Sequence, residues 1–207
     1  MPSESVAWRT ALAAFIARNA LPVEKYGHQP RLYELTRQVA ALSPTLAYDD
    51  DVVFAAAWLH DLGVFTGHRP EDPELLARWD NTVYAMEKSP AILEQVGFPP
   101  HKVQAVVETI RTHQPHCDPR TPEATLLRDA DMLEQLGAVA VLRTVCKVGR
   151  DSRFQTFTQA VASLQKALEQ LPPLLRLPAT RTLAEPRIAA LDTFLRSAST
   201  EAGDHLG

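Results

Sequence analysis

Residues 54–63, Phe-Ala-Ala-Ala-Trp-Leu-His-Asp-Leu-Gly, constrain the fold of this 207-residue chain more than any other stretch. At helical spacing Val53, Ala56 and His60 share one face, which predicts a buried helix that ends with an imidazole pointing inward. Gly63 fits the position just past the C-terminus of such a helix. A buried carboxylate beside that imidazole is costly unless it is compensated. A divalent metal ion would compensate it, because both groups are ordinary metal ligands.

Apolar residues recur at helical spacing along the rest of the chain, and no strand-like alternation is present. The predicted helices cover about residues 3–19, 28–42, 50–62, 74–88, 90–96, 101–113, 121–148, 154–171 and 182–195. No linker or internal repeat divides the sequence. We therefore predict an all-α helical bundle forming a single domain over residues 1–207, with a motif-bearing core of about 20–150 and the helices of 151–207 packing on it.

Charge, cysteine content and hydropathy limit the partners and the cellular location that we expect for this chain. The formal net charge is −4 and there is no long basic block, which argues against a nucleic-acid polymer as partner but allows a small basic pocket for a phosphorylated metabolite. Cys117 and Cys146 are too few for a disulfide framework, which favours a reducing cytoplasm. No apolar run is long enough for a membrane span, and the first residues do not resemble a signal peptide. We expect a cytoplasmic monomer or homodimer.

Four potential metal ligands occur in a suggestive order: His28 starts one predicted helix, His60 and Asp61 end another, and Asp131 lies in a Leu-rich helix. Two imidazoles and two carboxylates suit one divalent ion such as Mn²⁺, Fe²⁺, Mg²⁺, Ni²⁺, Co²⁺ or Zn²⁺. Such an ion activates water and neutralises phosphate oxygens. The acidic run 49–51, by contrast, is interpreted as a solvated cap at the start of the third helix rather than as a metal loop.

This order resembles the HD superfamily of metal-dependent phosphohydrolases, whose pattern is H…HD…D. Residues 27–32 (Gly-His-Gln-Pro-Arg-Leu) resemble its first-histidine segment, and residues 57–63 resemble its central motif. Residues 97–113 resemble the next helix of small bacterial members, and residues 129–137 resemble the "DAD-x-L-x-x-x-G" stretch. The resemblance covers about residues 20–150. It implies an HD-type fold in which Asp131, the second aspartate of the last motif, is the metal ligand.

The sequence also departs from the pattern of some members. Members with two metals carry an extra histidine where this chain has residues 78–84, Arg-Trp-Asp-Asn-Thr-Val-Tyr, so one metal is favoured. Members that cleave nucleoside monophosphates often have a glutamate at the position of Val64. Its absence favours cleavage between the α and β phosphates of a nucleoside triphosphate over removal of a monophosphate.

The resemblance implies a metal-dependent phosphohydrolase that acts on a small nucleotide. Asp61 is the expected catalytic group nearest the reactive water, and His113 is the expected proton donor or a further site residue. Arg31, Arg143 and Lys147 are the expected substrate-phosphate contacts. One alternative is a metal-containing module that binds a nucleotide and regulates without turnover. Oxidative iron chemistry is a weaker alternative, because it uses two irons and more histidines.

Overall fold

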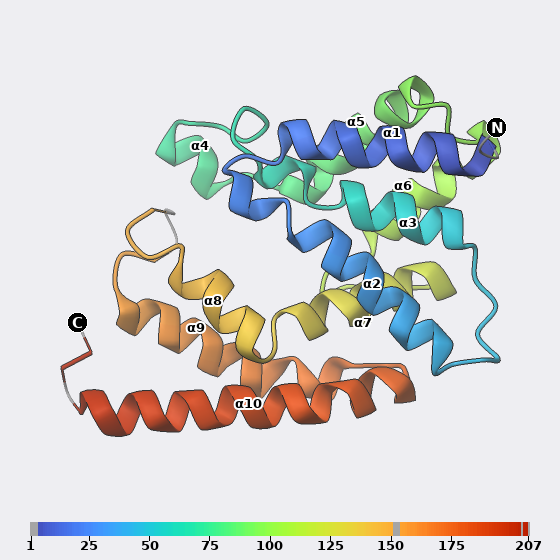
Figure 1. Cartoon of the computed structure of the whole chain (residues 1–207). Coiled ribbons are helices and arrows are strands. Elements are labelled where there is room, and N and C mark those ends of the chain that lie inside the picture. The colour runs from blue at the N-terminus through green and yellow to red at the C-terminus, as the bar shows by residue number, and fades with distance from the viewer. Residues whose placement is uncertain (1–3, 151–153, 204, 207) are drawn as a thin grey trace. The chain divides into compact units, whose positions relative to one another are not determined.

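The computed structural model of the chain describes residues 4–150, 154–203 and 205–206. These described ranges contain ten α-helices and no β-strand (Figure 1), which confirms the all-α prediction. The helices are α1 (Glu4–Asn19), α2 (His28–Ala41), α3 (Asp50–Leu59), α4 (Pro73–Ala77), α5 (Asn81–Gln95), α6 (Val103–Arg111), α7 (Pro122–Glu134), α8 (Ala138–Val145), α9 (Phe157–Gln170) and α10 (Pro178–Ala202). Four short 3₁₀ helices are η1 (Val23–Lys25), η2 (Leu62–Val64), η3 (Pro100–Lys102) and η4 (Pro172–Leu174). No helix in these ranges is both long enough and apolar enough to span a membrane.

Two compact units divide the chain, one ending at Arg128 and the other beginning at Asp129. The boundary falls inside α7, so this helix contributes residues to both units. The expectation that residues 151–207 pack on the motif-bearing core stays a prediction.

Helix α3 is the centre of the first unit, in contact with α1, α2, α5 and α6 (Figure 1). Every residue from Val52 to Leu59 is buried, as expected for a helix of small and apolar residues that has neighbours on all sides. The ring of Trp8 on α1 packs edge-on against Phe54 of α3, with the ring centroids 5.4 Å apart. This surrounded helix fixes the position of the His-Asp pair that follows it.

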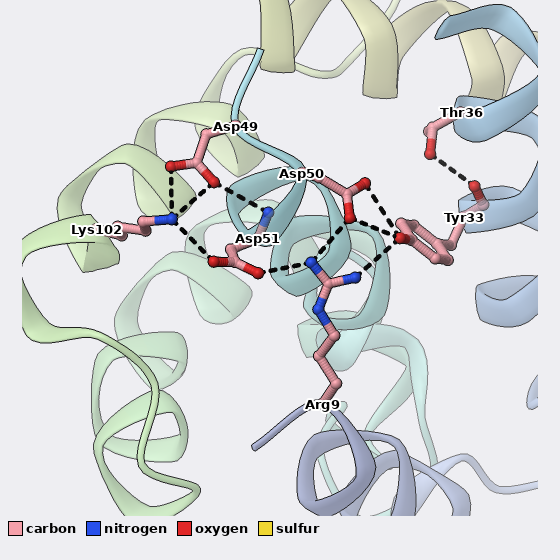
Figure 2. Close-up of polar contacts among 7 residues, drawn as sticks. All are labelled: Arg9, Tyr33, Thr36, Asp49, Asp50, Asp51 and Lys102. Atoms are coloured by element: carbon pink, nitrogen blue, oxygen red, sulfur yellow. Dashed lines mark hydrogen bonds and ion pairs between the residues drawn. The ribbon is translucent and has the colours of Figure 1, made fainter. Parts of the chain in front are cut away.

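Charged side chains hold the N-terminus of α3, as Figure 2 shows. The side chain of Asp49 caps the helix by accepting from the Asp51 backbone N–H. Arg9 of α1 donates to Asp51 Oδ1 at 2.6 Å and to Asp50 Oδ2 at 2.8 Å, and Lys102 donates to Asp51 Oδ2 at 2.8 Å. The interpretation of this run as a helix cap is therefore confirmed, but the carboxylates are paired with cations from two other segments as well as being partly solvated.

Some predicted helix boundaries were wrong. The predicted helix over 74–88 is interrupted, because Asp80 caps a new helix by accepting from the N–H groups of Thr82 and Val83. Helix α5 then continues through Pro90, where the sequence had indicated a break. The predicted helix over 121–148 is also two helices, since Gly137 adopts φ 87° between α7 and α8.

In the second unit, α8, α9 and α10 pack on one another. Gly137 is closely approached by Arg187 of α10: a Cβ atom added at Gly137 would lie 3.2 Å from the Arg187 Cβ. Arg187 also donates to the backbone carbonyl of Leu133, near the end of α7. Helix α10 is longer than the predicted 182–195 and tolerates Pro186 in its interior. These contacts set the end of α7 that carries Asp131.

Candidate metal centre

His28 is the first residue of α2 and is buried. Pro30 is tolerated there because the N–H groups of the first helical turn have no partner within the helix. Apolar residues of α2, including Leu32 and Leu35, are buried on the same side of the helix as His28. The helix start therefore projects the imidazole inward, as the sequence predicted.

His60 follows the last residue of α3 and is also buried. Its Nδ1 donates to the backbone carbonyl of Ala57 at 3.0 Å. In a neutral imidazole this bond leaves the lone pair on Nε2. The ring nitrogen available for a metal is therefore defined by a hydrogen bond within the same helix, which is a common arrangement for metal-binding histidines.

The structure brings together the three predicted ligands that lie in the first unit, His28, His60 and Asp61. The Nε2 atoms of His28 and His60 lie 3.2 Å apart, and Asp61 Oδ2 lies 3.6 Å from the first and 3.7 Å from the second. The histidine side chains are 5% and 1% exposed, whereas that of Asp61 is 24% exposed. The cluster thus has a buried imidazole side and a carboxylate side open to solvent.

The spacing of these atoms fits a single divalent ion. Two nitrogens bound at about 2.1 Å from one ion are about 3.0 Å apart at octahedral angles and about 3.4 Å apart at tetrahedral angles. The observed 3.2 Å separation falls between these values. Two neutral imidazoles and a carboxylate are also a suitable donor set for Mn²⁺, Fe²⁺, Ni²⁺, Co²⁺ or Zn²⁺. The residues therefore fit the metal that the sequence predicted.

Gly63 holds the chain after this cluster for a reason that differs from the predicted one. It lies inside η2 rather than just past a helix C-terminus. A Cβ atom there would lie 2.8 Å from Cα and 2.9 Å from the backbone oxygen of Asn81, the first residue of α5. The Gly63 carbonyl also accepts from Trp79 Nε1 at 2.8 Å. Only a residue without a side chain allows this close packing beside the His-Asp pair.

His113 lies two residues beyond the end of α6 and is buried. Its ring packs edge-on to that of His60, with the centroids 5.1 Å apart. Val106 and Ile110 form the buried stripe that leads to it, whereas Val103 and Val107 are only half-buried. The expected location beside the His-Asp pair is therefore observed, and the chemical role of His113 stays a prediction.

Arg31 lies one turn after His28 on α2 and is half-buried. A Cβ atom at Gly27 would lie 2.7 Å from its Nη1, so the guanidinium folds back toward the start of the helix that carries His28. Its predicted role as a phosphate contact remains a proposal. In the loop after η2, His68 Nδ1 lies 3.0 Å from the Tyr84 hydroxyl and His68 Nε2 lies 3.1 Å from Asn19 Oδ1. Burial lowers the pKa of His68.

In the second unit, α7 carries two aspartates with different surroundings. Asp129 is fully buried, and its carboxylate accepts from the backbone N–H groups of Arg176 and Leu177 at 3.0 and 2.8 Å. It therefore anchors the segment before α10, a role that the sequence did not indicate. Asp131 is half-buried and accepts from Gln135 Nε2 at 3.2 Å.

The predicted phosphate-binding cations of the second unit differ in their surroundings. Arg143 Nη1 pairs with Glu134 Oε2 at 2.6 Å, and the Glu134 side chain is only 2% exposed. This pair was not predicted, because the residues are nine positions apart and on different helices. Lys147 follows the end of α8, rather than lying on that helix as predicted. A substrate role for either residue stays a prediction. Arg143 would contact the substrate while it remains paired with Glu134.

A family comparison agrees with the site geometry. The HD domain model matches residues 26–136, which is more than half of the chain and includes all four predicted ligands. Among curated proteins, the ferric enterobactin-binding periplasmic protein FepB of Escherichia coli O6:H1 is 33% identical over 100 residues, which make up 48% of this chain and 28% of FepB. The chain therefore spans much less than two thirds of that relative.

Solved structures share the fold at low sequence identity. Bacillus subtilis YpgQ is 19% identical with a TM-score of 0.73, covering 96% of this chain and 98% of YpgQ. The structure of YpgQ in complex with ADP gives a TM-score of 0.72 at 19% identity, covering 97% of each chain. An HD-superfamily hydrolase from Bacillus thuringiensis is 18% identical with a TM-score of 0.66, covering 95% of this chain and 97% of that protein.

Proposed function

The chain belongs to the HD domain family, and on that premise we propose that it hydrolyses a phosphoanhydride bond of a small nucleotide with the help of one divalent metal ion. The observation that carries the proposal is the convergence of two buried histidine Nε2 atoms with the partly exposed carboxylate of Asp61. A substrate can approach this carboxylate from solvent while the imidazoles stay enclosed. Membership of the family supports metal-dependent hydrolysis of a phosphate bond. That the substrate is a nucleotide is our proposal.

His28, His60, Asp61 and Asp131 would hold the metal. When bound, it supplies charge that activates water and neutralises phosphate oxygens. The His60 hydrogen bond to Ala57 engages Nδ1 and leaves Nε2 as the ring nitrogen that would bind the metal. Asp131 comes from α7 of the second unit, and its inclusion rests on the family pattern within residues 26–136.

Asp61 and Arg31 would act on the reactants. The exposed carboxylate of Asp61 can accept a hydrogen bond from the attacking water and orient it toward phosphorus. Arg31, one turn after His28, would hold phosphate oxygens through its planar guanidinium. Arg143 and Lys147 would contribute positive charge to the same substrate, and His113 would assist proton transfer.

Two observations favour a nucleoside triphosphate. Val64 stands where members that cleave monophosphates often have a glutamate, so the residue associated with that reaction is missing. The structure of YpgQ, which shares the fold, has been determined with ADP, a ligand that contains a phosphoanhydride. Cleavage between the α and β phosphates, which yields pyrophosphate, is the reaction we propose.

The test is a panel of nucleoside mono- and triphosphates incubated with chelator-treated protein to which Mn²⁺, Mg²⁺, Co²⁺ or Ni²⁺ is added singly. We expect pyrophosphate from one or more triphosphates, only with metal present. Orthophosphate from monophosphates would overturn the proposed bond while preserving the hydrolase. No product of either kind, together with thermal stabilisation by a nucleotide and metal bound at one per chain, would establish a binding module in place of an enzyme.

A further inference from the structure

The ring of His113 has a hydrogen-bond partner at each nitrogen. Nδ1 lies 2.5 Å from the backbone carbonyl of Ile110, and Nε2 lies 3.2 Å from Nε2 of the Gln114 side chain. A carbonyl oxygen can only accept, so Nδ1 carries the proton. An amide nitrogen can only donate, so Nε2 of His113 must accept. Both contacts are satisfied by one form of the ring, with the proton on Nδ1 and the lone pair on Nε2.

The Gln114 amide is itself held in place. Its nitrogen also lies 3.2 Å from Oγ1 of Thr82 on α5, so its two N–H groups reach two different acceptors. The backbone at this point is fixed by Arg128, whose side chain is 2% exposed and donates to the Pro115 carbonyl at 2.6 Å. The Arg128 Nε also faces the Gln114 carbonyl at 3.4 Å. These contacts orient the amide toward His113 from both of its ends.

We propose that Gln114 is a positioning residue that holds the orientation of the His113 ring by donating to its Nε2 atom, while the Ile110 carbonyl keeps the proton on Nδ1. The inference rests on the proposed function, because it assigns His113 its form beside the catalytic cluster. His113 packs edge-on to His60, so a rotation of its ring would disturb the metal-binding imidazole. In this arrangement His113 reaches the reaction as a hydrogen-bond acceptor at Nε2, and it donates a proton from that atom only after receiving one.

This arrangement refines the role that the sequence predicted for His113. A proton donor needs an N–H directed at the substrate, but the only N–H of the ring is directed at the Ile110 carbonyl. The ring therefore acts first as a base or as a packing partner of His60. Gln114 supplies the polar partner that makes a lone pair tolerable on a ring that is 1% exposed.

Nitrogen-15 NMR of the histidine rings in metal-free protein tests the inference without requiring turnover. Spectra are recorded about two pH units above the ordinary histidine pKa of about 6.5, and the His113 signals are assigned by their loss in His113→Asn. We expect wild-type His113 to carry its proton on Nδ1 alone. In Gln114→Glu the side chain accepts instead of donating, so we expect a proton on Nε2. Gln114→Met, which keeps the length but lacks both groups, should leave the proton on Nδ1, where the Ile110 carbonyl accepts it, and should shift the Nε2 resonance because the donor to that atom is gone.

Two controls separate positioning from general damage. Thr82→Val removes the other acceptor of the amide but not its N–H groups, so the His113 proton should stay on Nδ1, where the Ile110 carbonyl accepts it. Gln165→Glu makes the same chemical change at an exposed site on α9 and should change neither spectrum nor activity. If the wild type hydrolyses a nucleotide, Gln114→Glu and Gln114→Met should lower kcat/KM by roughly 3–10-fold, as expected for one lost hydrogen bond.

A wild-type His113 with its proton on Nε2, or a Gln114→Glu protein with an unchanged His113 ring, would overturn the inference. Should Gln114→Glu fail to fold, an Nε2 resonance in folded Gln114→Met that is identical to that of the wild type would overturn it equally. Failure of the proposed function has a different signature, since a wild type that hydrolyses no nucleotide leaves the ring spectra and their interpretation intact.

Discussion

The Nε2 atoms of His28 and His60 lie 3.2 Å apart, although one residue begins α2 and the other follows the end of α3. Packing of α2 against α3 brings the two helix termini together and encloses both rings. The carboxylate of Asp61 lies beside the two rings and is partly exposed to solvent. The first unit thereby brings the two predicted histidine ligands together at two helix ends, with the predicted ligand Asp61 in the turn that follows α3.

The charge cluster at the opposite end of α3 should make stability depend on pH. Burial alone would raise the pKa of Asp51, but hydrogen bonds from Arg9 and Lys102 outweigh it and hold the pKa below 3.8. A lowered carboxyl pKa contributes stability above the unfolded value, and that contribution is lost as pH falls through the folded value. Asp51→Asn should lower the free energy of unfolding by about 1–2 kcal/mol at neutral pH. The loss should shrink as pH falls through the lowered folded pKa, because the wild-type carboxylate then becomes protonated as well.

Denaturant unfolding measured from neutral to acidic pH checks this expectation. The matched control is Asp192→Asn, which removes an exposed partner of Arg196 on α10 and should cost less than about 0.5 kcal/mol. Equal losses in the two variants, or a loss in Asp51→Asn that does not vary with pH, would contradict the account of the cluster.

Gly63→Ala should destabilise the first unit by about 1–3 kcal/mol, because the new Cβ would overlap the backbone of Asn81. Thermal and denaturant unfolding measure the effect. Gly27→Ala is the comparison variant, since its Cβ would meet only the flexible guanidinium of Arg31 and the cost should be about 1 kcal/mol or less. A Gly63→Ala protein as stable as the wild type would show that the close approach is not needed.

The two aspartates of α7 should respond differently to substitution. Asp129→Ala would leave two backbone N–H donors of the segment before α10 without their acceptor and should cost about 2–4 kcal/mol. Asp131→Asn keeps the size of the side chain and an oxygen for Gln135, so it should cost less than about 1 kcal/mol. Calorimetric titration with Mn²⁺ should instead show its metal affinity reduced by more than about 100-fold, beyond the usual effect of losing an outer partner. A stable Asp129→Ala protein, or unchanged affinity in Asp131→Asn, would refute this division of roles.

Local sequence patterns predicted much of the fold. Helical periodicity gave the all-α class, and the positions of His28 at a helix start and of His60 at a helix end followed from the apolar stripes beside them. The errors lie where a local signal competed with a cap or a turn. Asp80 starts a helix within a continuous helical pattern, and Pro90 lies inside one that it was expected to end.

The contacts between distant residues could not be read from the sequence. Asp51 meets cations 42 and 51 positions away, and Asp129 meets backbone groups 47 and 48 positions away. None of these four separations in sequence corresponds to the period of a helix or a strand. The contacts of Gln114 were not predicted either, because its amide meets Thr82 of another helix as well as the neighbouring His113.

The most direct test of the central claim is nucleotide hydrolysis by chelator-treated protein during stepwise addition of Mn²⁺, with His60→Gln measured alongside. The account predicts no product before metal is added, a rise in activity that levels off at one equivalent per chain, and no rise in a folded His60→Gln protein. Hydrolysis that survives complete chelation, or equal activity in His60→Gln, would show that the reaction does not depend on this centre.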